Sequence, residues 1–131
     1  MIKKYLVSEH ERPDFLRKHF GHRFLIFENL VYSFMDHFCE EYSGGYWQFY
    51  NLSNGGAFMS LDSDRTFSVC NPMNYFEGKM SAEAVSIGVN MFAMNSLMSE
   101  PCDEKLIDLY YALKDFGVQH NEAQAILGFI D

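Results

Sequence analysis

The pattern of hydrophobic and polar positions predicts an amphipathic helix in the first third of the chain. Within RFLIFENLVYSFMDHFCEEYSGG, large apolar side chains recur every three or four residues, at Phe24, Phe27, Val31, Phe34, Phe38 and Tyr42. The acidic residues fall largely between them, as on the solvated side of a helix. We expect this helix to end at Gly44-Gly45. A shorter helix is predicted before it, with Pro13 near its start and Gly21 as its stop.

The middle third changes to short segments rich in aromatic and β-branched residues, which predict strands. They are YWQFYNL, AFMSL, RTFSVCN and YFEGKM, and glycine, asparagine or aspartate separates them. Asn54-Gly55 predicts a tight hairpin between the first two, because these residues accept the positive φ that such turns require. LDSDRT and NPMN are interpreted as the next two turns. The pattern is typical of an antiparallel meander.

Helical patterns return in the last third. MSAEAVSIGVNMFAMNSLMSEP predicts a buried helix, because Ser81 can cap it and few charges follow Glu83. CDEKLIDLYYALKDFGVQH predicts a second helix, and NEAQAILGFID a third that is capped by Asn121. The predicted fold class is α+β, with an antiparallel three- to four-stranded meander flanked by two N-terminal and about three C-terminal helices. We expect the helices to pack largely on one face of the sheet.

Composition favours one globular domain spanning 1–131. The chain has 131 residues, of which 48% are hydrophobic and 17% aromatic, enough to build a core. We expect a cytoplasmic protein without a signal peptide or membrane contact, because its apolar runs are only a few residues long. Cys39, Cys70 and Cys102 are odd in number and widely spaced, so they are interpreted as small buried thiols in a reducing compartment.

The net charge of −8 is unevenly distributed along the sequence. Residues 1–23 carry six basic and three acidic side chains, whereas the remainder carries four basic and fifteen acidic ones. The acidic body argues against direct nucleic-acid binding, which needs lysine and arginine to displace counterions. The basic edge predicts docking through complementary charge, or it reflects chance clustering on a soluble surface. A monomer or a weak homodimer is expected.

No motif predicts a catalytic centre, a cofactor site or a metal site. None of the five histidines lies in a recognised catalytic setting, and we expect those of the basic N-terminal segment to face water. His37 and Cys39 are two apart on a predicted helix and therefore point in different directions. Asp62 and Asp64 lack the glycine and glutamate of a calcium loop. Neither glycine pair has a phosphate-binding pattern.

An acidic row in the last third raises the alternative of a protein that mimics DNA. Its members are Glu100, Asp103, Glu104, Asp108, Asp115 and Glu122. Lys105 and Lys114 interrupt the row, and a solvated helix face accounts for the same residues. Asp103, Glu104, Asp108 and Asp115 are kept as a candidate acidic contact face.

The segment EYSGGYWQFYNLSNGGAFMSL, residues 41–61, closely resembles the core signature of the ArdB/KlcA antirestriction proteins. That signature runs near YSGGYWxFYxLSNGGFYM. The matching positions are Tyr42, Ser43, Gly44, Gly45, Tyr46, Trp47, Phe49, Tyr50, Leu52, Ser53, Asn54, Gly55, Gly56 and Met59. Ala57-Phe58 departs from the pattern, which has two aromatic residues there. RPDFLRKHFGHRFL, NYFEGKMSAEAVSI and KLIDLYYALKDFGVQH resemble further family segments, so the resemblance covers nearly the whole chain.

The resemblance implies a cytoplasmic antirestriction protein of plasmids and other mobile elements. Such a protein relieves cleavage of incoming unmodified DNA by host type I restriction-modification systems. The resemblance also implies a fold without a known catalytic centre and without the DNA mimicry of the separate, more acidic ArdA class. The leading hypothesis is a non-catalytic inhibitor whose partner is the type I restriction-modification complex. Two alternatives stay open: a DNA mimic acting through the acidic C-terminal helices, and a small ligand-binding or enzymatic domain that uses the aromatic sheet.

The signature itself has two interpretations. Alternation places Tyr46, Gln48 and Tyr50 on one face of a strand, and Trp47 and Phe49 on the other. Either both faces are packed and the signature holds the fold, or one aromatic face binds a partner.

Overall fold

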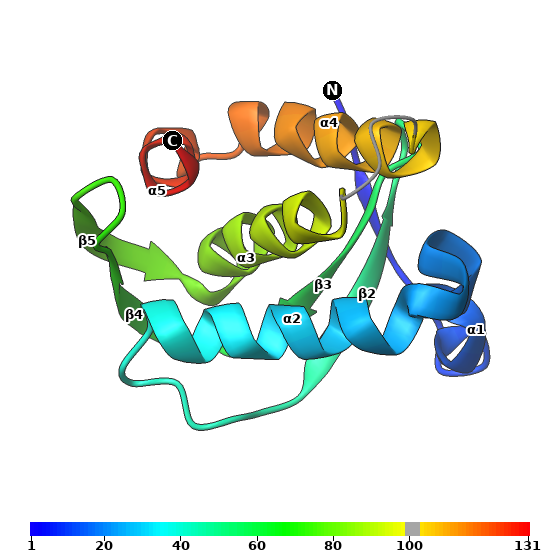
Figure 1. The fold of residues 1–131 in the computed structure, drawn as a ribbon, viewed down its shortest axis with the longest axis horizontal. Coiled ribbons are helices and arrows are strands. Elements are labelled where there is room, and N and C mark those ends of the chain that lie inside the picture. The colour runs from blue at the N-terminus through cyan, green and yellow to red at the C-terminus, as the bar shows by residue number, and fades with distance from the viewer. Residues whose placement is uncertain (99–102) are drawn as a thin grey trace.

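The computed structural model describes residues 1–98 and 103–131, and in these ranges it has five strands and five α-helices. The strands are β1 (Lys4–Leu6), β2 (Trp47–Leu52), β3 (Ala57–Leu61), β4 (Thr66–Asn71) and β5 (Phe76–Ser81). The helices are α1 (Arg12–Phe20), α2 (Phe24–Phe38), α3 (Ala82–Leu97), α4 (Glu104–Gln119) and α5 (Ala123–Ile130), with a 3₁₀ turn, η1 (Gly21–Arg23), between the first two. The predicted α+β class is confirmed (Figure 1).

Helix α3 forms the centre of the fold. It contacts α2, α4, α5 and β3, and twelve of its sixteen residues are buried. Figure 1 shows it between α2 and α4. Ser81 caps it as predicted, because its hydroxyl accepts a hydrogen bond from the Ala84 N–H at 3.1 Å. A helix that is apolar on most of its circumference requires this central position.

The four predicted strands are present, but they form two sheets and not one continuous meander. Strands β1, β2 and β3 form one antiparallel sheet, and β4 pairs only with β5 in the other. Side chains of α3 provide the physical reason. Asn90 Oδ1 accepts the Met59 N–H at 3.0 Å, and Ser86 Oγ accepts the Leu61 N–H at 3.0 Å. These bonds occupy the outer edge of β3, where β4 would otherwise pair.

Helices cover both faces of the three-stranded sheet, and the expectation that they lie largely on one face is wrong. On one face, Phe15 of α1 stacks on Phe49 with ring centroids 4.8 Å apart. On the other face, Phe58 packs against Phe116 of α4 at 5.7 Å. All five residues of β3 are buried as a result.

Two predicted element boundaries are also wrong. Helix α2 ends at Phe38 and not at Gly44-Gly45, because Cys39 adopts an extended backbone. Helix α5 has Glu122 at its N-cap, in place of Asn121. The stop at Gly21 is confirmed, since this residue has φ +59° directly after α1. Strand β1 was not predicted at all.

Candidate functional site

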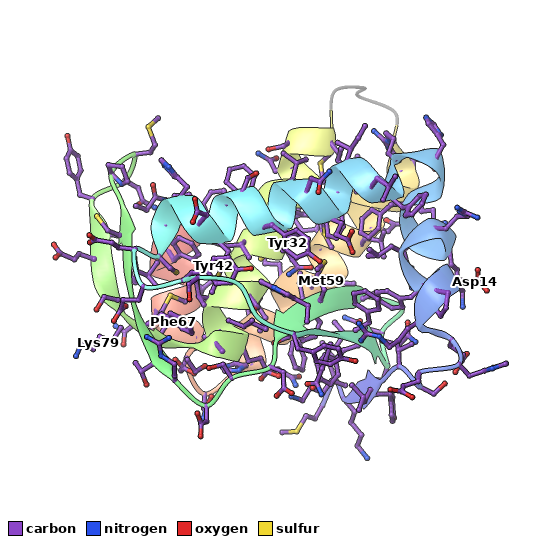
Figure 2. All side chains as sticks on the ribbon, turned by 90° about the horizontal axis from the view of Figure 1, so that it is seen from below. Asp14, Tyr32, Tyr42, Met59, Phe67 and Lys79 are labelled. Carbon is purple, nitrogen blue, oxygen red and sulfur yellow. The ribbon has the colours of Figure 1, made fainter. Side chains whose placement is uncertain are left out.

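The start of the signature segment shapes the connection from α2 to β2. Gly44 and Gly45 both have positive φ, +96° and +149°, which side chains rarely allow. A Cβ at Gly45 would lie 2.8 Å from Leu61 Cδ1. Tyr42 lies in this loop (Figure 2), and its hydroxyl oxygen accepts a hydrogen bond from Trp47 Nε1 at 3.2 Å. These residues therefore hold the loop against the sheet, whereas Ser43 is exposed.

The end of the signature joins three distant parts of the chain at the β2–β3 turn. Asn54 Nδ2 donates to the Ala112 carbonyl of α4 at 2.9 Å, and Asn54 Oδ1 accepts the Gly56 N–H at 3.1 Å. Ser53 Oγ accepts the Lys3 N–H at 2.9 Å, which fixes the chain beside β1. Gly55 has φ +90°, as the predicted hairpin requires.

A Cβ on Gly56 would lie 2.9 Å from the Ala112 Cβ, so α4 approaches too closely for any other residue. The close approach and the Asn54 bond act at the same point of α4. This half of the signature is therefore a docking point between hairpin and helix.

The aromatic residues of β2 are mostly internal. Trp47 is only 4% exposed and packs beside Tyr32 of α2. Tyr50 stacks on Phe58 at 5.3 Å. Tyr46 is 53% exposed, and its ring lies 4.8 Å from the Arg12 guanidinium carbon. Most of the signature thus supports the fold, and Tyr46 is its one large side chain on the surface.

The candidate acidic contact face lies on α4, but its members differ in role. Asp103 caps the helix by accepting the Leu106 N–H at 3.2 Å, and it pairs with Arg23 at 2.5 Å. The Arg23 hydrogen bond is the main reason why the pKa of Asp103 is lowered. Glu104, Asp108 and Asp115 are exposed. Glu100 lies outside the described residues.

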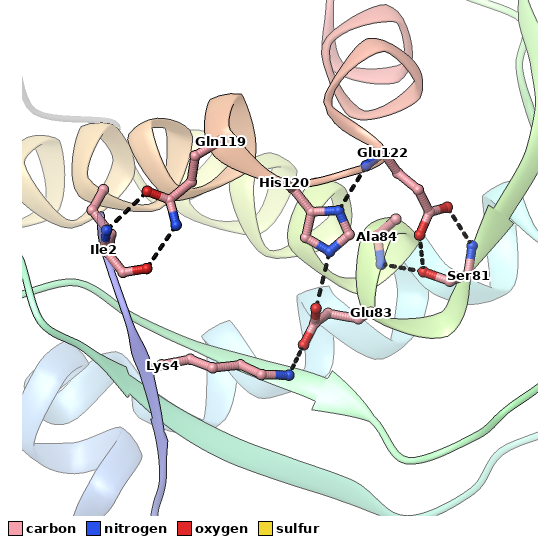
Figure 3. A network of polar contacts seen from close by, with 8 residues as sticks. All are labelled: Ile2, Lys4, Ser81, Glu83, Ala84, Gln119, His120 and Glu122. Atoms are coloured by element: carbon pink, nitrogen blue, oxygen red, sulfur yellow. Dashed lines mark hydrogen bonds and ion pairs between the residues drawn. The ribbon is translucent and has the colours of Figure 1, made fainter.

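A polar network joins the N-terminal strand to the helices, as Figure 3 shows. His120 Nδ1 accepts the Glu122 N–H at 3.0 Å, so the ring proton is on Nε2, which donates to Glu83 at 2.9 Å. Lys4 pairs with the other Glu83 oxygen. The Ser81 hydroxyl donates to Glu122 at 2.5 Å and not to the histidine. The network therefore contains no serine–histidine pair, and each of its members has a structural partner.

Among the predicted surface histidines, His19 differs from expectation. It is half-buried and lies 3.3 Å from Asn51 Oδ1, and burial lowers its pKa. His10 and His22 are exposed, as expected for the basic segment.

An open groove of about 910 Å³ lies between the end of α2 and the outer face of the β4–β5 hairpin. Asp36, His37, Glu40 and Glu41 line it from α2 and the following loop, and Ser68, Cys70, Glu77 and Lys79 line it from the hairpin. Glu41 joins the two sides by accepting the Ser68 N–H at 2.6 Å. Lys79 extends from the outer face of the hairpin in Figure 2.

Sequence reasoning missed this groove, although the alternation of β4 and β5 was a usable signal. Cys70 is exposed there, so its assignment as a buried thiol is wrong, whereas Cys39 is buried as expected. Burial raises the pKa of Cys39 to about 12. Within residues 1–98 and 103–131, no three His, Cys, Asp or Glu side chains are placed to hold a metal ion. In the same part of the chain, no helix is long and apolar enough to span a bilayer.

Known proteins share both the sequence and the α+β fold of this chain. A profile described as "Antirestriction protein" matches residues 40–131, and the chain belongs to this family. Antirestriction protein KlcA of Escherichia coli is 38% identical over 96% of this chain and 92% of its own length. The uncharacterized protein YafX of E. coli K12 is 42% identical over 95% of this chain and 85% of its own.

A solved structure is also similar, with a TM-score of 0.91 and 38% sequence identity. The match covers 99% of this chain and 95% of the solved one. That structure comes from work on the KlcA and ArdB proteins, which show a novel fold and antirestriction activity against type I DNA restriction systems in vivo but not in vitro.

Proposed function

We propose that this chain relieves cleavage of incoming unmodified DNA by type I restriction-modification systems. The observation that carries the proposal is the similarity, over nearly the whole chain, to KlcA and ArdB, whose antirestriction activity is directed against type I systems. The family profile spans residues 40–131, which include the signature residues that join the β2–β3 hairpin to α4, so the same scaffold is expected to support the same activity.

The proposed mode is non-catalytic inhibition by contact with the restriction complex. In support, His120 is held by the Glu83 carboxylate and by the Glu122 N–H, and Glu83 is also paired with Lys4, so this histidine and this carboxylate both have structural partners. The net charge of −8 makes direct binding to DNA unfavourable, so a protein surface is the proposed target. We propose that the chain acts in the cytoplasm as one domain, as a monomer or a weak homodimer.

The DNA-mimic alternative has less support from the geometry. Asp103 is engaged with Arg23 and with the start of α4, which leaves Glu104, Asp108 and Asp115 as the exposed acids of the candidate face. Tyr111 and Val118 are exposed on the same helix, each more than half. Apolar side chains among the carboxylates differ from the surface of a duplex backbone.

The test is the plating efficiency of unmodified phage on a type I restricting host, with and without the chain. We expect expression to raise plating toward that on a non-restricting host. Phage carrying the host modification is the control, because its plating should not change. Since the KlcA and ArdB proteins show antirestriction activity in vivo but not in vitro, the cellular assay is the decisive one. Unchanged restriction at high expression would refute the proposed function.

A further inference from the structure

We propose that the tip of the β4–β5 hairpin, which is the turn at residues 72–75, and the acidic groove beside it form the surface that binds the partner protein. The partner is expected to offer an apolar pocket with a basic rim. The inference rests on the proposed function, since it assigns the contact surface for that activity. In Figure 1 the tip projects at one end of the molecule, beside α5.

The tip presents two large apolar side chains directly to solvent. Met73 is 87% exposed and Tyr75 is 92% exposed, more than any other large hydrophobic side chain after Met1 in the described part of the chain. Tyr75 also has φ +63°, and it is the one residue other than glycine with positive φ among the described residues. This conformation is costly for a bulky residue and is concentrated at functional sites. Neither feature contributes to the core.

Two asparagines hold the tip rigidly against the end of α5. Asn71 Nδ2 donates to the Phe129 carbonyl at 3.0 Å, and Asn74 Nδ2 donates to the Gly128 and Phe129 carbonyls at 3.1 Å. Their Oδ1 atoms accept the backbone N–H groups of Met73, at 3.1 Å, and of Phe76, at 2.9 Å. These bonds also satisfy carbonyls that the helix end leaves free.

The tip is therefore fixed before any partner arrives, so little conformational entropy remains to be lost on binding. Exposed methionine and tyrosine on a rigid support are typical anchors of protein interfaces. A small-molecule site would instead bury such side chains in a pocket.

The groove beside the tip is acidic, which determines the charge of the partner. Asp36, Glu40, Glu41 and Glu77 line it, and Lys79 is the one lysine or arginine among the described residues that line it. The groove also lies at the C-terminal end of α2, where the helix dipole adds negative potential. Pro72 lines the groove, so tip and groove are continuous. Charge complementarity thus selects a basic protein surface around the apolar pocket.

The first test replaces the two exposed side chains, those of Met73 and Tyr75, by changes that are not expected to destabilise the fold. Met73→Ser with Tyr75→Gly removes both side chains, and glycine suits the backbone of residue 75. We expect the melting temperature not to fall, while restriction relief in the plating assay drops about tenfold or more, because anchor residues dominate the binding energy of an interface. Tyr5→Thr is the matched control, because Tyr5 is 55% exposed on β1 in the other sheet. The control should retain full relief.

The second test reverses the groove charge. Glu40→Lys with Glu77→Lys should weaken relief, because both residues are exposed on the groove. Asp62→Lys with Asp64→Lys makes the same charge change in the exposed β3–β4 turn and should have no effect. Equal loss from both pairs would indicate a net-charge effect and overturn the inference.

The outcomes separate this inference from the proposed function. If the wild-type chain relieves restriction and the Met73/Tyr75 variant relieves it equally, the surface is wrong and the function stands. If the wild-type chain gives no relief of restriction, the proposed function and this inference are both refuted. Sedimentation equilibrium of the purified chain is the remaining check. A wild-type dimer that this variant dissociates would make the tip a contact between copies and refute the inference.

Discussion

Gln119, the last residue of α4, binds the backbone of Ile2 through both ends of its side-chain amide. Its Oε1 accepts the Ile2 N–H at 2.9 Å, and its Nε2 donates to the Ile2 carbonyl at 2.6 Å (Figure 3). The amide thus imitates a neighbouring strand next to β1. Asn90 does the same at the opposite edge of the sheet, where it binds both the N–H and the carbonyl of Met59. Side chains from two helices therefore bind backbone groups on both sides of the sheet, Gln119 at Ile2 just before β1 and Asn90 at Met59 within β3.

Removing the Gln119 amide should loosen β1. We expect Gln119→Ala to reduce the free energy of unfolding by about 1 kcal/mol, because two exposed hydrogen bonds are lost. Gln119→Glu keeps the acceptor and loses the donor, so it should fall between wild type and alanine at neutral pH. Urea unfolding gives the energies, and hydrogen exchange at Tyr5 locates the change. Unchanged exchange in the alanine variant would contradict this role.

Glu83 should make stability depend on acid pH. Its pKa is lowered in the folded protein by the hydrogen bond from His120, and further by Lys4. As pH falls below its ordinary value of 4.5, the unfolded chain takes up the proton first, so stability is lost down to the lower, folded pKa. We expect Glu83→Gln to be less stable at neutral pH and to lose less on acidification. Urea unfolding across pH measures both, with the exposed Glu9→Gln as the control.

Two helix glycines should respond in opposite ways to alanine. A Cβ at Gly88 of α3 would lie 2.4 Å from the Phe129 ring, which is fully buried, so Gly88→Ala should cost about 1–3 kcal/mol. At Gly117 of α4 the nearest contact would be 3.4 Å from Ile126, an ordinary distance. Gly117→Ala should then stabilise by up to about 1 kcal/mol through helix propensity. Thermal unfolding of the two variants tests the pair.

Variants of Trp47 and Tyr46 should distinguish the buried part of the signature from its exposed part. Trp47→Ala should cost about 3–5 kcal/mol and abolish restriction relief through unfolding, because the ring is buried. Tyr46→Ser should cost less than about 1 kcal/mol, since it removes an exposed ring and one contact with Arg12. Urea unfolding compares them. A stable Trp47→Ala variant would show that the ring is not needed for the fold.

Reversing two charges on α4 should spare the fold. Asp108 and Asp115 are exposed, so Asp108→Lys with Asp115→Lys should change stability by less than about 0.5 kcal/mol. Circular dichroism and melting temperature verify the fold before plating. Full restriction relief in this variant would exclude α4 as the acidic contact face, whereas its loss with an intact fold would place the contact there.

Local patterns predicted the five helices and four of the five strands of the described residues, but not all of their ends. The periodicity that ran from Phe24 to Tyr42 continued past the true end of α2, because Tyr42 is also packed on the core. It reaches the core from a loop and not from a helix. The spacing of apolar residues shows which side chains are packed in the core, and both a helix and a loop can place a side chain there.

Pairing between strands depended on partners distant in sequence. The edge of β3 is closed by Asn90 and Ser86, about 25 to 31 positions away, so no turn signal near Leu61 could show that β4 belongs to another sheet. Strand β1 is three residues long and exposed throughout, and its sequence has no alternation to detect. Likewise, the groove joins residues 36–41 to 68–79, a proximity that only the fold creates.

Cys39 and Cys70 differ in exposure, so the groove can be labelled selectively through the thiol of Cys70. Cys39 is buried and, with a pKa of about 12, holds almost no thiolate near neutral pH, whereas Cys70 lies open on β4 within the groove. With Cys102 replaced by serine, a maleimide dye should attach selectively at position 70. The dye would then change its emission when a bound protein displaces water from that wall, so occupancy of the groove could be followed by fluorescence.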